Sequence, residues 1–371
     1  MNCDMVIYNH NGNIILDLYK EHRQLSIKCE YLPVVFFFKE EHFKEELYKE
    51  NMNFLNTIEL EAILNELVDK KVLVYVDEYD KKGSPLGIDS LNKSIRYYYW
   101  ANRIFGDEKY NSTYNEFLTL MNKRSTQPPI YKEYSGKKYK LPFPKEVKAD
   151  LIKTMLDRQS IRYVDSDDKL ELQELSDILY YANGETAFAL DSGMGPAVFK
   201  TIPTPGGRAA SELYFINFSL SDIPIGIYHY SVKEHCLELL SRGDFKEDFF
   251  HICGGQLQVR LSNGLIVITE RIDRVIWKYQ DASAYRSMLI ETGALVQNVY
   301  LISAALGVAT GVIGTFRDTI LEELLNINPN IEFTTAIFTL GKKKNLTRFD
   351  RPSLHDYKEY DENDRFREEN N

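Results

Sequence analysis

Basic residues are in deficit along this chain, and that deficit excludes one broad class of function. The 371 residues include 45 Lys and Arg against 55 Asp and Glu, which gives a net charge of −10 at pH 7. A protein that binds nucleic acid neutralises phosphates with a surplus of clustered Lys and Arg. The acidic balance therefore argues against a nucleic-acid partner.

Cysteine is scarce as well. The four cysteines (Cys3, Cys29, Cys236 and Cys253) lie far apart, and no two of them form a CxxC pair. This spacing supports neither a zinc site nor a disulfide framework, so we expect no metal and a reducing, cytoplasmic location. The sequence contains no P-loop, nucleophile elbow, HExxH or GxGxxG segment. Their absence removes the common nucleotide-binding and hydrolase interpretations.

Long hydrophobic segments are rare too. The first residues, MNCDMVIYNHNG, have neither a basic region nor a long apolar run, so we expect no signal peptide. The window from Thr292 to Phe316 has no charged residue, but it includes polar residues and four glycines. We expect a buried core helix followed by a Gly-rich segment there, rather than a membrane span.

What the chain does contain is typical of a globular protein, with 44% hydrophobic and 27% charged residues. Its length predicts two or three domains. Shifts in pattern divide it into residues 1–90, a Pro- and aromatic-rich connector at 91–144, a larger domain at 145–345 and a polar tail at 346–371. The connector's prolines favour extended chain.

The first 90 residues read as a small winged-helix-like domain. The runs MVIYN, IILDLY and PVVFFF are β-like, and TIELEAILNELVDK has helical spacing. The alternation at Val72–Val76 then predicts a strand directly after that helix. Helix, turn and strand form the ending of a winged helix, and the acidic surroundings favour a peptide-binding or structural module over a DNA-binding one.

From residue 145 the pattern is that of an α+β fold. We expect an amphipathic helix at 145–157 and a long helix at 285–306. Between them we expect a helix in LELQELSDILYYAN, which begins at a capping box of Asp168 and Glu171 and ends at Gly184. Strands are expected at SELYFINF, IGIYHYS, CLELL, LIVITE and Phe333–Leu340, with a hairpin around Val232–His235 and a last helix at Thr319–Leu325.

Three segments contain groups that can carry chemistry. Arg158, Ser160 and Arg162 can hold a phosphate, because guanidinium forks match phosphate oxygens, although such triplets also occur at solvated helix ends. The segment PTPGGR at 203–208 can let backbone amides approach a flat or anionic ligand, or it can be an ordinary loop. Lys278 and Tyr279 can form an acid/base pair if burial lowers the pKa of the lysine, or they can be a surface charge beside a core ring.

The order of these segments resembles the nitroreductase-like flavoproteins, and more narrowly the SagB-type azoline dehydrogenases of thiazole/oxazole peptide biosynthesis. The resemblance covers RQSIR, then TIPTPGGRAASELY, then a stretch of the family form KYxxRxYR…ExGxxxQN. In this last stretch the matching residues are Lys278, Tyr279, Tyr285, Arg286, Glu291, Gly293, Gln297 and Asn298. The chain departs from the family pattern at Thr204, Pro205, Ala210 and Ser283.

The resemblance implies a nitroreductase-like FMN-binding fold with a mixed or antiparallel sheet flanked by helices. It also implies a homodimer, FMN-dependent oxidation of a peptide thiazoline or oxazoline to the azole, and a precursor peptide and a cyclodehydratase as partners. Lys278 and Tyr279 are then the catalytic pair. The implied FMN-binding residues are Arg158, Ser160, Arg162, Pro203, Thr204, Gly206, Gly207, Gln297, Gly314 and Lys342. Two alternatives stay open: an NAD(P)H-dependent nitro or quinone reductase, and a non-catalytic peptide-binding scaffold on the same fold.

Overall fold

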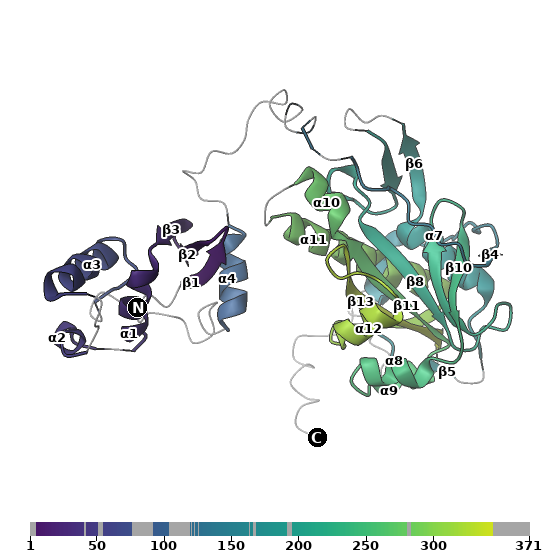
Figure 1. Cartoon of the computed structure of the whole chain (residues 1–371). Helices are drawn as coiled ribbons and strands as arrows, with labels where there is room; N and C mark the ends of the chain where they lie inside the picture. The colour runs from purple at the N-terminus through teal and green to yellow at the C-terminus, as the bar shows by residue number, and fades with distance from the viewer. Residues whose placement is uncertain are drawn as a thin grey trace, which may run out of the picture. The chain divides into compact units, whose positions relative to one another are not determined.

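A computed structural model gives the structure of residues 5–343, except for residues 41, 51–54, 76–91, 104–118, 120, 122, 125, 163, 166–167, 191–194 and 280–282, which it does not describe. The chain divides into two compact units, Met1–Tyr110 and Asn111–Asn371 (Figure 1). This division falls inside the connector predicted at 91–144. The predicted tail at 346–371 lies outside the described residues.

The N-terminal unit combines a three-stranded antiparallel sheet with short helices. The strands pair in the order β1 (Val6–His10), β2 (Asn13–Leu18) and β3 (Arg23–Ile27). The helices are a 3₁₀ turn (Cys29–Tyr31), α1 (Leu32–Phe37), α2 (Lys44–Leu47), α3 (Thr57–Asp69) and α4 (Lys93–Ala101). The strands expected at MVIYN and IILDLY and the helix expected from Thr57 are confirmed. A capping box between Asn56 and Glu59 stabilises the start of α3.

Helix α4 comes from the predicted connector but packs on the N-terminal sheet. The ring of Tyr97 lies edge-on to that of Tyr19, with 5.3 Å between the ring centroids. The Tyr97 hydroxyl donates to a carboxylate oxygen of Asp17 at 3.4 Å. The first compact unit therefore extends beyond residue 90.

Two expectations for the N-terminal unit are wrong. The run PVVFFF forms helix α1 instead of a strand, because Pro33 fits the first turn of a helix, where no backbone donor is needed. After α3 the chain turns at Lys71, and the amides of Val72 and Leu73 both donate to the carbonyl of Leu67. Residues 72–75 consequently form a turn and loop, so the winged-helix ending is not formed there.

An antiparallel sheet forms the centre of the C-terminal unit. Its strands pair in the order β12-β13-β11-β8-β9-β10-β4, and β5 pairs with β13. These strands are β4 (Lys138–Lys140), β5 (Val164–Asp165), β8 (Ser211–Asn217), β9 (Gly226–Ser231), β10 (Cys236–Arg242), β11 (Gly264–Arg271), β12 (Val308–Ile313) and β13 (Glu332–Lys343). A separate hairpin joins β6 (Glu185–Ala189) to β7 (Ala197–Lys200). The predicted strands and the β9–β10 hairpin are confirmed.

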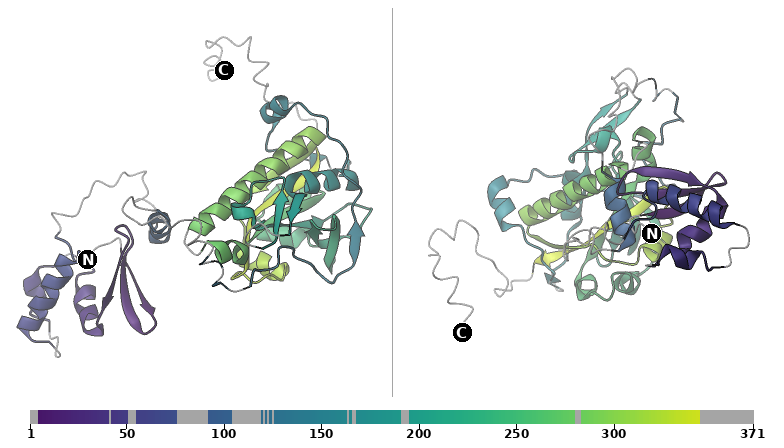
Figure 2. Two further views of the ribbon diagram at one scale, coloured as in Figure 1. Left: turned by 90° about the horizontal axis from the view of Figure 1, so that it is seen from above. Right: turned by 90° about the vertical axis from the view of Figure 1, so that its left-hand side faces the viewer.

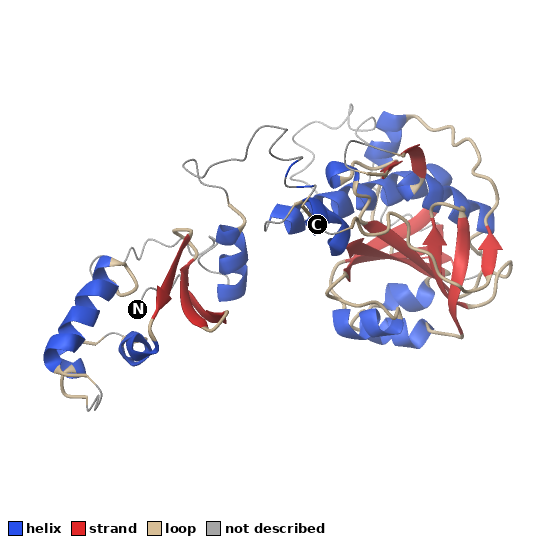
Figure 3. Cartoon of the chain, turned by 45° about the horizontal axis from the view of Figure 1, so that its top comes forward, coloured by secondary structure: helices blue, strands red, loops and turns tan. Residues whose placement is uncertain are grey.

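Helices cover both faces of this sheet and bury it (Figures 2 and 3). On one face, α7 (Leu172–Asn183) and α11 (Ser283–Leu306) share a core with Phe215 of β8. On the other face, α8 (Lys246–Ile252), α9 (Leu257–Leu261) and α12 (Asp318–Leu324) pack against Tyr214 and Ile216. Successive side chains of β8 thus enter opposite cores, which explains its unbroken apolar run. The predicted α+β class is confirmed.

Two helices differ in detail from their expected form, and a third agrees with it. The helix expected at 145–157 is limited to α6 (Leu151–Asp157), whose cap is Asp150. The capping box of α7 joins Glu171 to Glu174 instead of Asp168 to Glu171, while Gly184 ends the helix as expected. The helix expected at 285–306 is confirmed as α11. By length and composition alone, α11 could cross a membrane, a test that core helices of soluble proteins also pass. In this structure α11 packs on α7 and the sheet.

Candidate functional site

The loop between β7 and β8 turns sharply at its two central glycines. Gly206 and Gly207 have φ angles of 57° and 70°, a region that favours glycine. The amide of Gly207 donates to the carbonyl of Thr204 at 3.2 Å, which closes the turn. A Cβ atom on Gly206 would come within 2.6 Å of both Lys278 Nζ and the Tyr279 hydroxyl. The structure therefore brings the predicted flavin loop directly against the predicted catalytic pair.

Lys278 and Tyr279 lie at the end of α10 (Ile272–Lys278), the short helix that precedes α11. Lys278 Nζ donates to the carbonyl oxygen of Gly206 at 3.3 Å and lies 5.4 Å from the centre of the Tyr279 ring. Burial lowers the pKa of Lys278, and the charge of Arg208 lowers it further. A lysine with a lowered pKa is more often a neutral amine at physiological pH, which is the form that accepts a proton.

Arg208 follows the two glycines and is the site residue to which sequence reasoning assigns no role. Its side chain is 2% exposed and stacks on the Trp277 ring at 5.4 Å. Its Nε atom donates to the carbonyl oxygen of Gly206 at 3.1 Å, whereas its two terminal nitrogens have no hydrogen-bond partner among the described residues. The only sequence signal for it is an arginine placed directly after a Gly-Gly turn.

The predicted phosphate segment packs against β12 and α11. The amide of Ile161 donates to the carbonyl of Thr310 at 2.8 Å, and Ser160 Oγ lies 2.8 Å from the hydroxyl of Tyr300. The Arg158 guanidinium stacks on the Tyr300 ring at 5.1 Å, and Arg162 is exposed. Within the described residues neither arginine has a carboxylate partner. Both charges therefore remain available to an anion.

The other predicted cofactor residues lie on elements around these two groups. Gln297 is exposed on α11, one turn before Tyr300, and Gly314 is exposed just after β12, with open space where a Cβ would be. Pro203 and Thr204 lead into the turn at Gly206. Lys342 on β13 is instead engaged by a salt bridge to Glu174. The FMN-binding roles of these residues remain predictions.

A buried pair of carboxyl groups lies where the loop enters β8. Ser211 Oγ is 2.7 Å from Glu270 and 3.0 Å from Glu291, and the Ser211 amide donates to Glu291 at 2.9 Å. Burial raises the pKa of both carboxyl groups, and the charge of Glu291 raises that of Glu270 further. Both shifts disfavour the charged forms of the two carboxyl groups. This pair ties α11 and β11 to the base of the loop.

A second buried network crosses β8, β9 and β10. His229 lies 3.1 Å from Glu212 and 2.9 Å from Glu238, and Arg274 forms a 2.7 Å ion pair with Glu212. Burial alone would lower the pKa of His229, but its hydrogen bonds to the two glutamates raise it overall. The hydrogen bonds to the two carboxylates thus favour the charged form of the imidazole, against the effect of burial.

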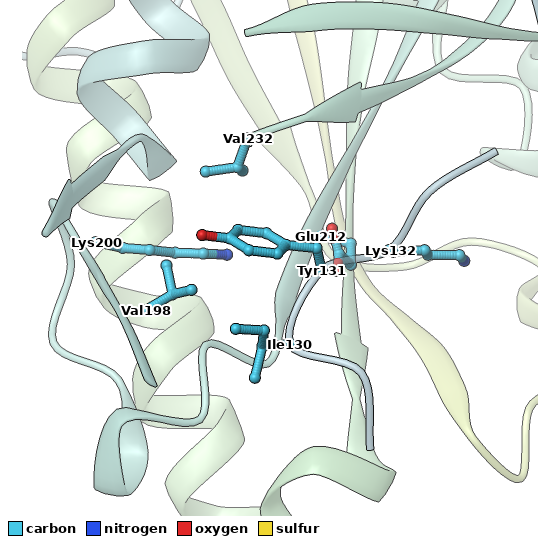
Figure 4. A pocket seen from close by; sticks show the side chains of 7 residues that line it. All are labelled: Ile130, Tyr131, Lys132, Val198, Lys200, Glu212 and Val232. Atoms are coloured by element: carbon cyan, nitrogen blue, oxygen red, sulfur yellow. The ribbon is translucent and has the colours of Figure 1, made fainter. Parts of the chain in front are cut away.

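A small cavity borders this network (Figure 4). Its lining residues are Ile130, Tyr131, Lys132, Val198, Lys200, Glu212 and Val232. The volume of about 10 Å³ has room for about one water molecule, so this cavity is not a substrate site.

Comparisons with known proteins agree with this geometry. The model of the nitroreductase family matches residues 155–342. A protein of Methanocaldococcus jannaschii named as a candidate nitroreductase is 27% identical over 203 residues, which make up 55% of this chain and 95% of that protein. The trifolitoxin-processing protein TfxB of Rhizobium leguminosarum bv. trifolii is 24% identical over 181 residues, or 48% of either chain. This chain thus spans about half of TfxB.

One solved structure supports the fold. A candidate nitroreductase from Anabaena variabilis ATCC 29413 gives a TM-score of 0.52 at 24% identity, over 66% of this chain and 45% of that one. The nitroreductase-like fold predicted from the sequence is therefore confirmed.

Proposed function

This chain belongs to the nitroreductase family of flavin-dependent oxidoreductases, and we propose that it oxidises thiazoline or oxazoline rings of a modified peptide to aromatic azoles. The observation that carries the proposal is the contact of the Gly206 turn with Lys278 and Tyr279. Removal of two hydrogens from an azoline ring needs a base on one side of the ring and a hydride acceptor on the other. With the flavin placed along the turn, the flavin would be the hydride acceptor and the Lys-Tyr pair beside it would be the base.

The donor groups near the turn fit FMN. We assign the FMN phosphate to Arg158, Ser160 and Arg162, because the two guanidinium groups, which have no carboxylate partner in the part of the chain that the structure describes, match its charge. The two unpaired terminal nitrogens of buried Arg208 are donors that a bound group with acceptor oxygens or nitrogens would satisfy. When bound, FMN supplies the two-electron chemistry by taking the hydride, and oxygen reoxidises it.

Lys278 takes the ring proton in this proposal. A C–H bond of the ring breaks, its proton moves to Lys278 Nζ, and the second hydrogen leaves as the hydride. The lowered pKa of Lys278 supports this role, because only the neutral amine has a lone pair to offer. The hydroxyl of Tyr279 lies against the same turn, from where it can orient the amine or exchange the proton.

The substrate class and the partners follow from the same proposal. The name of TfxB describes a protein that processes trifolitoxin, and we extend peptide processing to this chain. The substrate is then a precursor peptide whose rings a cyclodehydratase has already formed. We further propose a cytoplasmic homodimer, in which α11 contributes to the interface.

The test is azole formation by variants of the catalytic pair. We expect Lys278→Ala and Tyr279→Phe to keep the flavin but to form azole roughly 10²–10⁴-fold more slowly, because a positioned base contributes that much to the rate. Mass spectrometry of a thiazoline peptide measures the loss of two hydrogens per ring. Lys148→Ala removes an exposed lysine and is the matched control, with an expected wild-type rate.

Three results would contradict the proposal. Near wild-type rates in both variants with flavin bound would make the pair structural. Rapid flavin reduction by NAD(P)H, with transfer to nitro or quinone compounds and no reaction with azolines, would favour a reductase instead. A protein that purifies without flavin would favour a peptide-binding scaffold.

A further inference from the structure

An arginine from a distant part of the sequence caps the short helix that carries the Lys-Tyr pair. Helix α10 ends at Lys278, and the last carbonyl groups of a helix have no partner inside the helix. Arg124, 153 residues before Trp277 in the sequence, donates through Nη1 to the carbonyl oxygens of both Trp277 and Lys278. A positive charge at a helix C-terminus also complements the negative end of the helix dipole. Arg124 therefore has the chemistry and the place of a C-terminal cap.

The start of α10 is held by a second arginine. Arg274, which is 2% exposed, donates from Nε to the carbonyl oxygen of Pro129 at 2.9 Å and from Nη1 to that of Ala209 at 2.7 Å. Ala209 lies at the end of the loop that contains the Gly206 turn. Helix α10 is thus joined to that loop near its start, and to the segment before β4 at both its start and its C-terminal end.

The capped end is the part of α10 from which the proposed catalytic side chains project. One of the two capped carbonyl groups belongs to Lys278 itself, and the next peptide bond leads to Tyr279. Lys278 Nζ is 3.3 Å from the carbonyl oxygen of Gly206, and the Tyr279 hydroxyl borders the same glycine. A displacement of this helix end would carry both side chains away from the turn.

We propose that Arg124 is a positioning residue, which fixes the C-terminal end of α10 and so holds Lys278 and Tyr279 at the Gly206 turn. Arg124 acts through the backbone of α10, so this role needs no contact between Arg124 and the substrate. The effect on catalysis rests on the proposed function, whereas the capping of α10 does not depend on it.

Arg317 provides a matched control, because it makes the same kind of contact at another helix. It donates through Nη1 to the carbonyl oxygen of His251, and its backbone amide donates to that of Ile252 at 2.9 Å, both at the end of α8. Helix α8 packs on the face of the sheet opposite to α11. Arg317→Met therefore removes a similar arginine contact from a helix that has no part in the proposed reaction.

The first test measures the stability of the helix end without any azoline substrate. Amide hydrogen exchange is followed by mass spectrometry on the purified full-length chain and its variants. We expect Arg124→Met to speed exchange in the peptide covering residues 272–279 roughly tenfold or more, because two charge-assisted hydrogen bonds are lost there. Exchange in the peptide covering 246–252 should stay unchanged. Arg317→Met should give the opposite pattern, whereas a general loss of stability would speed exchange in both peptides.

The second test measures azole formation by the same variants. We expect Arg124→Met to lower kcat roughly 10–10²-fold with little change in KM, because a misplaced base slows the chemical step without weakening substrate binding. Arg124→Lys keeps a charged donor and should recover most of this rate. Arg317→Met should have the wild-type kcat.

Two results overturn the inference. One is unchanged exchange at residues 272–279 in folded Arg124→Met; Arg124→Gln, which has a shorter and neutral side chain, gives the same comparison if the methionine variant does not fold. The other is faster exchange at 272–279 with a wild-type kcat, since the cap would then not position the pair. A wild type that oxidises no azoline, while the Arg124 variant still shows faster exchange at 272–279, contradicts the proposed function alone, so the two failures are distinguishable.

Discussion

Arg158 and Arg162 flank Ser160 and project from one short segment that β12 holds by a backbone hydrogen bond. Arg158 is partly buried on the Tyr300 ring, while Arg162 is exposed. A phosphate placed between them would receive two charge-assisted hydrogen bonds, of which the one from the exposed arginine is the weaker because water screens it.

Replacing both arginines by alanine should therefore release FMN. Each charge-assisted contact contributes about 1.5–3 kcal/mol, so the double variant should lose roughly 10²–10⁴-fold in flavin affinity. Fluorescence titration of the flavin-stripped protein with FMN measures this change. Arg260→Ala, which removes an exposed arginine paired with Glu247, is the control and should bind FMN normally. Unchanged affinity in the double variant would remove the phosphate assignment.

The sequence allows a prediction of which segments meet in the site, but not of every side chain that completes it. Lys278, Tyr279 and the glycine turn are recognisable because the family resemblance carries them. The place of Arg208 beside Lys278 depends on how α10 packs against the start of β8, and no local pattern encodes that contact. The pairing of Glu270 with Glu291 around Ser211 likewise joins three elements that are far apart in the chain.

The turn at Pro205–Gly207 is the element most sensitive to a single methyl group. Gly206→Ala would place a Cβ within 2.6 Å of Lys278 Nζ and the Tyr279 hydroxyl, so both must move. We expect azole formation to fall by at least tenfold while the protein stays folded, because small displacements of a positioned base are costly in rate. Steady-state kinetics with a circular-dichroism check measures both effects.

Gly254→Ala is the matched control for this change. Gly254 also has a positive φ, 67° against 57° for Gly206, but a Cβ there meets nothing within 4 Å. Both variants carry similar backbone strain, so only the contact with the Lys-Tyr pair differs. Equal loss of activity in the two would show that backbone strain, not displacement of the pair, is responsible.

Elements with strong periodicity are predicted well, and those decided by tertiary contacts are not. The apolar runs of β8, β9 and β11 have clear strand patterns because helices bury both faces of the sheet. Helix α1 is missed because a short apolar run does not distinguish helix from strand. The strand expected after α3 is missed because the carbonyl of Leu67 takes up the amides of Val72 and Leu73.

At the level of the whole molecule, the exposed apolar side chains of α11 and α6 favour a dimer. Leu289 and Ile290 are 42% and 65% exposed on α11, and Leu151 and Ile152 are 60% and 58% exposed near α6's start. Such side chains are costly to leave in water. We expect light scattering to give twice the chain mass of 43.2 kDa, and Ile290→Asp to shift the protein toward the monomer.

An exposed isoleucine in the N-terminal unit provides the control. Ile58 is 82% exposed at the start of α3, so Ile58→Asp changes the same residue type on another surface and should leave the dimer intact. A wild-type monomer that still binds FMN would disprove the dimer and its interface on α11.

The most direct measurement of the proposed activity is the flavin absorbance of the whole protein after anaerobic mixing with a thiazoline-containing peptide. Our proposal predicts that the yellow absorbance bleaches in a single turnover, that thiazole appears in equal amount, and that Lys278→Ala bleaches at least a hundredfold more slowly. No bleaching by the thiazoline peptide, together with rapid bleaching by NADH or NADPH, would contradict it.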